Sequence, residues 1–225
     1  MPKPKPKPKP RPAVRVDTLE PRQRATRQSM RIATEFSVQW MLKHPYRSEF
    51  HCRAEHLYAG LLEGDPDVLS YVPQPFTFQV GRARYTPDFF VQAKDRSFVV
   101  ELKPEGNADT RLTEPTAQYL KRYDIDFKVV ANESVTERAI EAENWLEIVR
   151  SLHVHRELPT EREEHRLLET FYNEPECVLG DVINPGDRRA SSDREMALFR
   201  LLYRGLLRAE LSKHPLDFNT KVCLS

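Results

Sequence analysis

The chain has 225 residues, enough for one core of ordinary size and a smaller second unit. Hydrophobic residues make up 39% of it and charged residues 31%, as in a typical globular protein, and no apolar run approaches the roughly 18 residues that cross a bilayer. These features exclude a membrane protein, and three widely spaced cysteines with no secretory signal favour a reducing, cytoplasmic location without structural zinc.

The N-terminal segment carries most of the positive charge. Residues 1–31 contain ten Lys or Arg against two acidic residues, and the rest of the chain is net acidic. Alternating proline and lysine, MPKPKPKPKPRP, predict a solvated polyproline-like extension, so we expect a flexible basic arm over residues 1–21. We expect this arm to bind nucleic-acid phosphates, and the alternative is a linker or solubility tail. The candidate DNA-binding side chains are Lys3, Lys5, Lys7, Lys9 and Arg11.

The next part of the chain, residues 22–150, alternates helical and strand-like patterns. Apolar residues at helical spacing predict helices over residues 22–44, 52–62, 115–122 and 135–149. Short apolar runs bounded by Gly, Pro and polar residues predict strands over residues 68–71, 76–80, 84–92, 98–103 and 126–131. We therefore expect one domain over residues 22–150, in which an antiparallel meander lies among helices.

The remaining residues, 151–225, begin with a charged linker. Apolar spacing predicts helices over residues 161–172 and 193–211, with a short strand over residues 218–223. We expect a small, mostly helical, winged-helix-like domain here. The expected fold class is therefore α/β with a helical C-terminal domain.

Two apolar strands carry the polar residues that point to chemistry. Glu101 and Lys103 are two residues apart in a strand, so both side chains leave the same face of the sheet. Asp88 follows a proline on the neighbouring strand and can face Glu101. Two carboxylates and a backbone carbonyl, that of Leu102, are hard oxygen ligands that suit Mg²⁺ or Mn²⁺.

Such a metal site would support phosphodiester hydrolysis. The metal can deliver a water and stabilise the leaving oxygen, while Lys103 orients or deprotonates that water and balances charge on the phosphorane. A solvated salt bridge between Glu101 and Lys103 is the alternative, and spacing alone leaves both interpretations open.

The motif and its surroundings resemble a known family. Pro87-Asp88, a twelve-residue interval and Glu101-Leu102-Lys103 resemble the PD-(D/E)XK motif of restriction endonucleases. The flanking sequence is similar to the TnsA endonuclease subunit of heteromeric transposases. The similar segments are Asp65-Pro66, Gln74-Pro75, Tyr85-Thr86-Pro87-Asp88-Phe89, Val99-Val100-Glu101-Leu102-Lys103-Pro104, Tyr123-Asp124-Ile125-Asp126-Phe127 and Leu201-Leu202-Tyr203-Arg204-Gly205-Leu206-Leu207.

The resemblance implies a fold and a function. The fold would be a restriction-endonuclease-like core with a mixed sheet flanked by helices, followed by the winged-helix-like domain. The protein would be a Mg²⁺-dependent DNA endonuclease, with Mn²⁺ able to substitute, that cuts the 5′ ends of a transposon. A TnsB-like DDE transposase would cut and join the 3′ ends, and a TnsC-like AAA+ ATPase would contact the C-terminal part. The location would be the bacterial cytoplasm, at the nucleoid when active, and RNA-guided targeting stays open.

The resemblance also implies roles for individual residues. Asp88 and Glu101 would be metal ligands, Lys103 the active-site lysine and Glu55 an additional carboxylate from a preceding helix. Family members often have Gln where this chain has Glu101, and the lead-in to Glu55 differs from the family pattern. The helix carboxylate is therefore either Glu55 or Glu49.

Other functions fit the sequence less well. A free-standing restriction or repair nuclease and a non-catalytic DNA-binding adaptor remain as alternatives. His153, His155 and His165 lack a fourth ligand at zinc-finger spacing. The chain contains no GxxxxGK[ST], GxSxG or GxGxxG motif, so nucleotide and acyl-enzyme chemistry have no support.

Overall fold

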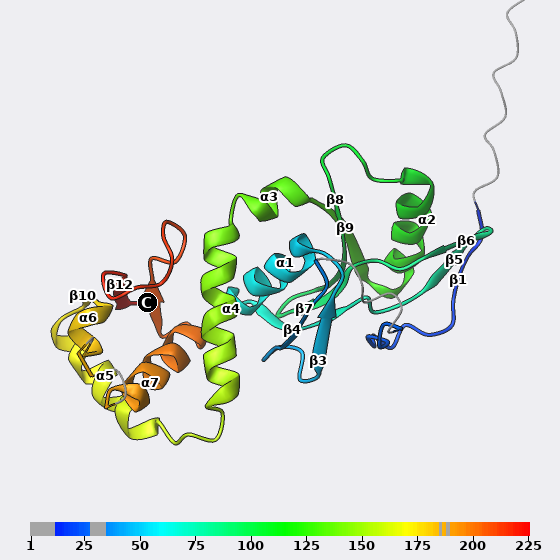
Figure 1. Cartoon of the computed structure of the whole chain (residues 1–225). Coiled ribbons are helices and arrows are strands. Elements are labelled where there is room, and N and C mark those ends of the chain that lie inside the picture. The colour runs from blue at the N-terminus through cyan, green and yellow to red at the C-terminus, as the bar shows by residue number, and fades with distance from the viewer. Residues whose placement is uncertain (1–11, 28–34, 185, 188–189) are drawn as a thin grey trace, which may run out of the picture.

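The computed structural model describes residues 12–27, 35–184, 186–187 and 190–225. The molecule is a mixed α/β chain, with the N-terminal sheets on one side of the long helix α4 (Ala139–Val154) and the C-terminal helices with their small sheet on the other (Figure 1). Within the described part of the chain, no helix combines the length and apolar character that crossing a membrane requires.

A four-stranded sheet forms the centre of the first part. Its order is β4-β7-β8-β9, antiparallel except for the parallel pair of β8 and β9. The strands are β4 (Val68–Pro73), β7 (Phe89–Ala93), β8 (Ser97–Lys103) and β9 (Ile125–Ala131). The central strand β8 is covered on both faces, which explains its unbroken apolar run. The mixed α/β character is confirmed, and residues 84–92 form two strands rather than one.

The two faces of the sheet pack against different layers. Phe89 and Val100 belong to a core shared with α1 (Arg53–Gly64) and α4, whereas Phe90 and Val99 belong to a second core. This alternation follows from the two-residue period of a strand. The second core lies beneath α2 (Thr110–Leu120), the 3₁₀ turn η2 (Lys121–Tyr123) and a small sheet of order β1-β5-β6. Its strands are β1 (Val14–Val16), β5 (Phe78–Val80) and β6 (Ala83–Tyr85).

Helices α1 and α4 approach each other closely at Gly60. A Cβ atom at this position would lie 2.5 Å from the carbonyl oxygen of Ala142 in α4. Only glycine permits this separation of the two backbones. The short helix α3 (Asn132–Thr136) joins β9 to α4.

The segment before the first core, residues 12–27, lies along the small sheet. β1 pairs antiparallel with β5, and the amide of Arg22 donates to the carbonyl of Pro75 at 3.1 Å. This segment, called the strap below, overlaps the expected arm of residues 1–21. Residues 1–11, with the five candidate DNA-binding cations, lie outside the described residues.

The helix expected over residues 22–44 is wrong for residues 37–40. These residues form β2 (Ser37–Trp40), which pairs with β3 (Arg47–Phe50). Gln39 is buried while Val38 and Trp40 are exposed, so the true period here is two residues. The exposed Trp40 ring stacks on His153 of α4. Residues 28–34 of the expected helix lie outside the described residues.

The C-terminal part packs around its own apolar core. It contains α5 (Glu161–Asn173), α6 (Leu179–Val182), α7 (Ser192–Tyr203) and a sheet of order β10-β12-β11. Its strands are β10 (Glu176–Val178), β11 (Leu207–Ala209) and β12 (Lys221–Leu224). The helix expected over residues 193–211 ends at Tyr203, because Gly205 adopts a φ of 71° and turns the chain into β11. The winged-helix-like domain stays a prediction.

Helix α4 belongs to both parts. Leu146 and Val149 pack in the core beside the central sheet, and Ile148 and Leu152 pack in the C-terminal core. The helix therefore runs through residue 150, where we expected the boundary between domains.

A buried carboxylate, Glu63, joins the two parts. It lies in the last turn of α1 and accepts hydrogen bonds from Tyr71 at 3.0 Å and from Tyr203 of α7 at 2.7 Å. The amides of Leu42 and Lys43 also donate to it, and the Lys43 ammonium donates to the carbonyl of Glu63. We call this cluster the Glu63 hub.

Candidate active site

Three strand ends meet at one edge of the central sheet. The amide of Asp88, just before β7, donates to the carbonyl of Val100 in β8 at 3.0 Å. The carbonyl of Asp88 accepts from the amide of Gln74, just after β4, at 2.8 Å. The ladder that pairs Pro73, Phe89 and Val100 therefore continues, and it places Gln74, Asp88 and Glu101 on adjacent strands.

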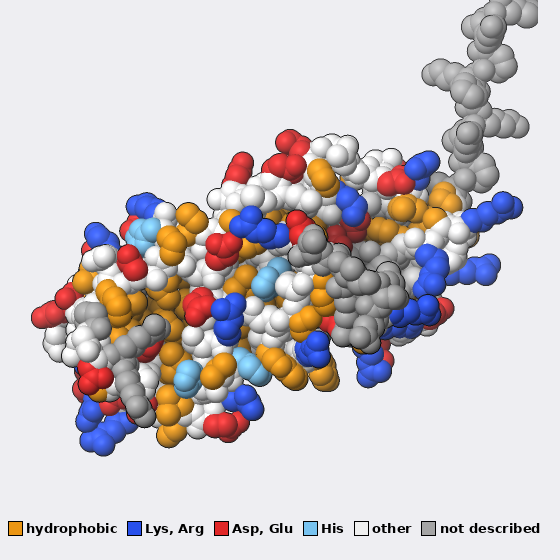
Figure 2. Space-filling model, in the orientation of Figure 1, with side chains coloured by type: hydrophobic (Ala, Val, Ile, Leu, Met, Phe, Trp, Pro, Cys, Tyr) orange, Lys and Arg blue, Asp and Glu red, His pale blue; other side chains and the backbone are white. Residues whose placement is uncertain are grey.

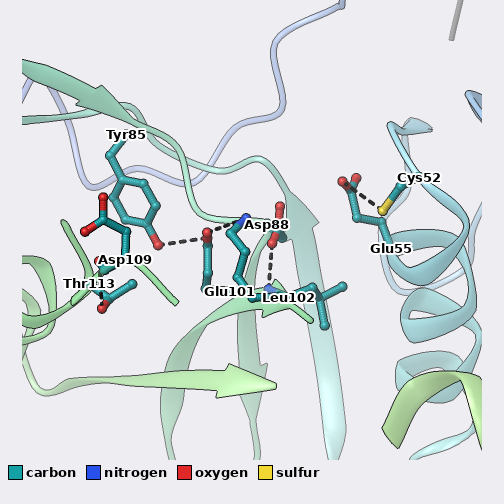
Figure 3. A network of polar contacts seen from close by, with 9 residues as sticks. Cys52, Glu55, Tyr85, Asp88, Glu101, Leu102, Asp109 and Thr113 are labelled. Carbon is teal, nitrogen blue, oxygen red and sulfur yellow. Dashed lines mark hydrogen bonds and ion pairs between the residues drawn. The ribbon is translucent and has the colours of Figure 1, made fainter. Parts of the chain in front are cut away.

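The predicted trio lies together at this edge. Figure 3 shows the Asp88 and Glu101 carboxylates beside each other. Lys103 Nζ lies 2.8 Å from Glu101 Oε1, and Tyr85 donates to Glu101 Oε2 at 2.8 Å. Asp88 Oδ2 accepts from the amide of Leu102 at 2.6 Å. Asp88, Glu101 and Lys103, which the sequence spacing predicted to share a site, therefore lie together in the structure.

The Asp88 carboxyl titrates abnormally. Burial raises its pKa to about 7, helped by the negative charges of Glu101 and Glu55, while the Leu102 amide and Lys103 act in the opposite direction. Three carboxylates thus face one ammonium. A site with this excess of negative charge favours a bound cation.

The two groups bonded to Glu101 keep their protons. Burial lowers the pKa of Lys103, but the hydrogen bond and charge of Glu101, with Asp88 and Glu55, outweigh it and leave that pKa raised. Burial and the adjacent Glu101 raise the pKa of the Tyr85 phenol. Lys103 is therefore a cation at neutral pH, and Tyr85 is a neutral donor.

Glu55 and Glu49 occupy different surroundings. Glu55 lies in the first turn of α1, and its charge acts on both Asp88 and Lys103. Its Oε2 accepts from the amide of His51 at 3.0 Å. Glu49 lies in β3, where its carboxylate accepts from the amide of Thr26 in the strap. Of the two candidates, Glu55 is the one whose charge reaches the trio.

The donor set fits a hard divalent cation in its chemistry. Asp88, Glu101 and the Leu102 carbonyl are oxygen ligands, and they would hold Mg²⁺ or Mn²⁺ together with water. Among the residues that the structure describes, no group of three or more His, Cys, Asp or Glu side chains has the arrangement of a ready metal site. Figure 3 shows why, because Glu55 stands apart on α1 with its carboxylate turned to Cys52.

Sequence reasoning missed two residues of the site, Gln74 and Tyr85. Gln74 donates to Glu55 Oε2 at 2.7 Å, and Tyr85 holds Glu101. Gln74 follows a strand and precedes a proline. Both residues lie in segments that resemble the family, where the sequence analysis gives them no role, and the position of Tyr85 three residues before Asp88 was the available signal.

A cleft of about 470 Å³ opens beside Asp88. The strap forms one wall of this cleft with Arg22 and Arg24, and Gln74 and Thr86 lie on the other side. In Figure 2, Lys and Arg side chains gather at the end of the molecule that holds the small sheet. Of the trio, Asp88 lines this cleft.

The three histidines considered for zinc have separate contacts. His153 stacks on Trp40, His155 contacts the carbonyl of Ser151, and His165 lies 3.4 Å from Glu169. None of these contacts involves a second histidine of the set.

Comparison with known proteins identifies the central segment. Residues 65–132 match the family model described as TnsA-like endonuclease N terminal. The matched segment contains Asp88, Glu101 and Lys103 and leaves out Glu55 and the C-terminal part. No curated protein matches the chain. The match confirms the resemblance over residues 65–132, which are similar to the N-terminal domain of TnsA-like endonucleases, and it supports a nuclease role in transposition.

Proposed function

We propose that the protein is a Mg²⁺-dependent DNA endonuclease subunit that hydrolyses phosphodiesters at the 5′ ends of a transposon during cut-and-paste transposition. Its catalytic part would be a restriction-endonuclease-like core. The observation that carries the proposal is the meeting of Asp88, Glu101 and Lys103 at one sheet edge, inside the segment that matches the TnsA-like family model.

The chain's own residues have separate tasks in this chemistry. Asp88, Glu101 and the Leu102 carbonyl would hold the metal, and Glu55 would complete its shell of ligands from α1. When bound, Mg²⁺ supplies a Lewis acid for the scissile phosphate and a water of lowered pKa. Tyr85 fixes one oxygen of Glu101 by its hydrogen bond.

Lys103 acts as a cation. Its ammonium lies 2.8 Å from Glu101 Oε1, so it would stabilise negative charge on the phosphorane and orient the attacking water.

The cleft beside Asp88 would receive the DNA strand. Arg22 and Arg24 in its wall are suited to phosphates that flank the scissile one. The acidic side chains of Asp17 and Glu20 also line the cleft and would repel phosphates, so the DNA strand would follow the side that carries Arg22 and Arg24.

Deleting residues 1–11 would weaken DNA binding and flatten its salt dependence without changing metal affinity.

The partners follow from the same proposal. A TnsB-like DDE transposase would process the 3′ ends, and a TnsC-like AAA+ ATPase would bind the C-terminal part around α5 and α7. The C-terminal sheet β10-β12-β11 beside these helices supports a separate binding module, for which the winged-helix-like fold is our proposal.

The test uses the full chain with its transposase partner on transposon-end DNA. Asp88→Ala and Lys103→Ala should each abolish 5′ cleavage while 3′ joining persists. Asp95→Ala, in the exposed turn between β7 and β8, is the matched control and should cleave normally. If both site variants retain 5′ cleavage, the assignment is wrong. Cleavage of naked DNA by the protein alone would instead indicate a free-standing nuclease.

A further inference from the structure

We infer that Gln74 is a positioning residue of the metal site and that, together with Gln23, it fixes the Glu55 carboxylate in place. The inference rests on the proposed function. It makes the strap, residues 12–27, part of the metal site rather than only a lead-in to the fold.

The backbone of Gln74 is held in an unusual conformation. Its φ is 41°, in the left-handed region that favours glycine and that other residues enter at a cost in strain. The amide of Gln74 donates to the carbonyl of Asp88 at 2.8 Å in this conformation. The strained residue is thus bonded directly to the backbone of a proposed metal ligand.

The side chain of Gln74 links two other residues. Its Nε2 donates to Glu55 Oε2 at 2.7 Å, and its Oε1 accepts from Gln23 Nε2 at 2.5 Å. Both ends of the amide are therefore used. A carboxylate at this position would repel Glu55, and an aliphatic side chain would leave its oxygen without this donor.

The direction of this chain of hydrogen bonds is fixed by the backbone of β3. The amide of Glu49 can only donate, so it must face Gln23 Oε1, which it does at 3.1 Å. Gln23 Nε2 must then face the Glu49 carbonyl and Gln74 Oε1. Gln74 Nε2 is left to face Glu55. The amide orientations are therefore mutually determined.

Neutral donors hold Glu55 without cancelling its charge. Its Oε2 accepts from Gln74 and from the amide of His51, while the Cys52 thiol lies 3.6 Å from Oε1. The carboxylate is oriented but stays available to a cation. Groups that orient a metal ligand in this way typically change metal affinity about 10- to 100-fold when they are removed.

The test separates the Gln74 side chain from its backbone. Gln74→Gly tolerates the positive φ and keeps the amide that bonds Asp88, so it deletes only the side-chain link. We expect Mn²⁺, titrated calorimetrically into DNA-free protein, to bind about tenfold more weakly than to the wild type. The Mg²⁺ concentration that half-activates 5′ cleavage should rise in parallel, with the rate at saturating Mg²⁺ largely kept.

Three further variants examine the chain of hydrogen bonds itself. Gln23→Ala should weaken Mn²⁺ binding by about threefold, and the double variant Gln23→Ala/Gln74→Gly should bind no more weakly than Gln74→Gly alone, because both act through one link. Glu55→Ala should match Gln74→Gly. Gln79→Ala is the control, since Gln79 bonds only locally to the Gly81 carbonyl in the small sheet.

The outcomes distinguish this inference from the proposed function. Wild-type Mn²⁺ affinity in both Gln23→Ala and Glu55→Ala overturns the inference, even if Gln74→Gly should fail to fold. Loss of Mn²⁺ binding and cleavage in Asp88→Ala would in that case leave the proposed function standing. If Asp88→Ala changes neither quantity, the proposed function itself fails.

Discussion

The molecule holds buried carboxylates in two contrasting settings. In the Glu63 hub, four donors from Leu42, Lys43, Tyr71 and Tyr203 meet one carboxylate that is 1% exposed. At the strand ends, the Asp88 carboxylate accepts one hydrogen bond from the described residues, that of the Leu102 amide, and lies near other carboxylates.

The difference separates a structural site from a functional one. Burial raises the pKa of Glu63, and its hydrogen bonds to Lys43, Tyr203 and Tyr71 oppose that rise. Burial and like charges raise the pKa of Asp88 to about 7, which only a proton or another cation relieves. The donors around Glu63 suit a carboxylate that stabilises the fold, and the negative charge around Asp88 suits the cation of the proposed metal site.

The largest expected effect is on catalysis at the strand ends. Asp88→Asn removes a metal ligand and should lower the rate of 5′ cleavage by at least about a hundredfold. The same change removes a buried like charge, so the metal-free variant should be as stable as the wild type or more stable by about 1 kcal/mol at pH 8. Cleavage assays and urea unfolding measure the two quantities. Destabilisation of the Asp88→Asn variant would place Asp88 with the structural carboxylates.

For the Glu63 hub we expect a loss of stability without a loss of metal affinity. Glu63→Ala leaves two buried tyrosine hydroxyls and two backbone amides without their acceptor, and should cost about 3 kcal/mol of unfolding free energy. The metal affinity of the protein that remains folded should be unchanged. Urea unfolding and Mn²⁺ titration check the two statements. Glu105→Ala, an exposed change beyond the motif, provides the comparison and should alter neither.

His44, a buried histidine beside the hub, contributes to the pH dependence of stability, as does His56, whose pKa burial also lowers to about 4. Burial lowers the pKa of His44 to about 4, below its usual 6.5. The unfolded chain therefore takes up a proton before the folded one, and stability falls as pH drops from about 6.5 towards 4. His44→Asn should remove about 2 kcal/mol of this fall at pH 5, measured by unfolding at pH 7 and pH 5. An identical fall in the variant would contradict the assignment, and exposed His155→Asn serves as the control.

The smallest effect is expected where the hub joins the C-terminal part. Tyr203→Phe deletes one hydrogen bond to Glu63 and should cost about 1 kcal/mol. Loosened packing between α1 and α7 should appear as faster amide exchange at the ends of both helices. Tyr172→Phe, on an exposed side chain of α5, should change neither quantity.

The sequence predicted local elements well where one face of an element is buried. The helix expected over residues 52–62 is observed as Arg53–Gly64, and the strand expected over residues 98–103 as Ser97–Lys103. Residues 37–40 were predicted as helix because Trp40 continues an apolar spacing of four residues. They form the strand β2, and the Trp40 ring stacks on His153 of α4. The two strands within residues 84–92 belong to different sheets, which periodicity does not reveal.

The residues of the candidate site likewise include some that the sequence predicts and some that it does not. Asp88, Glu101 and Lys103 could be predicted because they lie on hairpin-connected strands, where spacing determines facing. The contact of Gln74 with Glu55 could not, because it joins a strand end to a helix 19 residues earlier. The support from Gln23 spans 51 residues and depends on how the strap crosses the fold. Contacts of this kind are set by tertiary packing rather than by local pattern.

Helix α1 connects the candidate active site to the Glu63 hub. Its first turn carries Glu55 and its last turn carries Glu63, so about 12 Å of helix separates a proposed metal-site carboxylate from the contact with α7. A helix of this length is expected to move as a rigid body, and its closest backbone contact with α4, between Gly60 and Ala142, would be the point about which it turns. A tilt imposed on the C-terminal part would therefore displace Glu55, so under the proposed function a partner bound to that part would act on the metal site through α1.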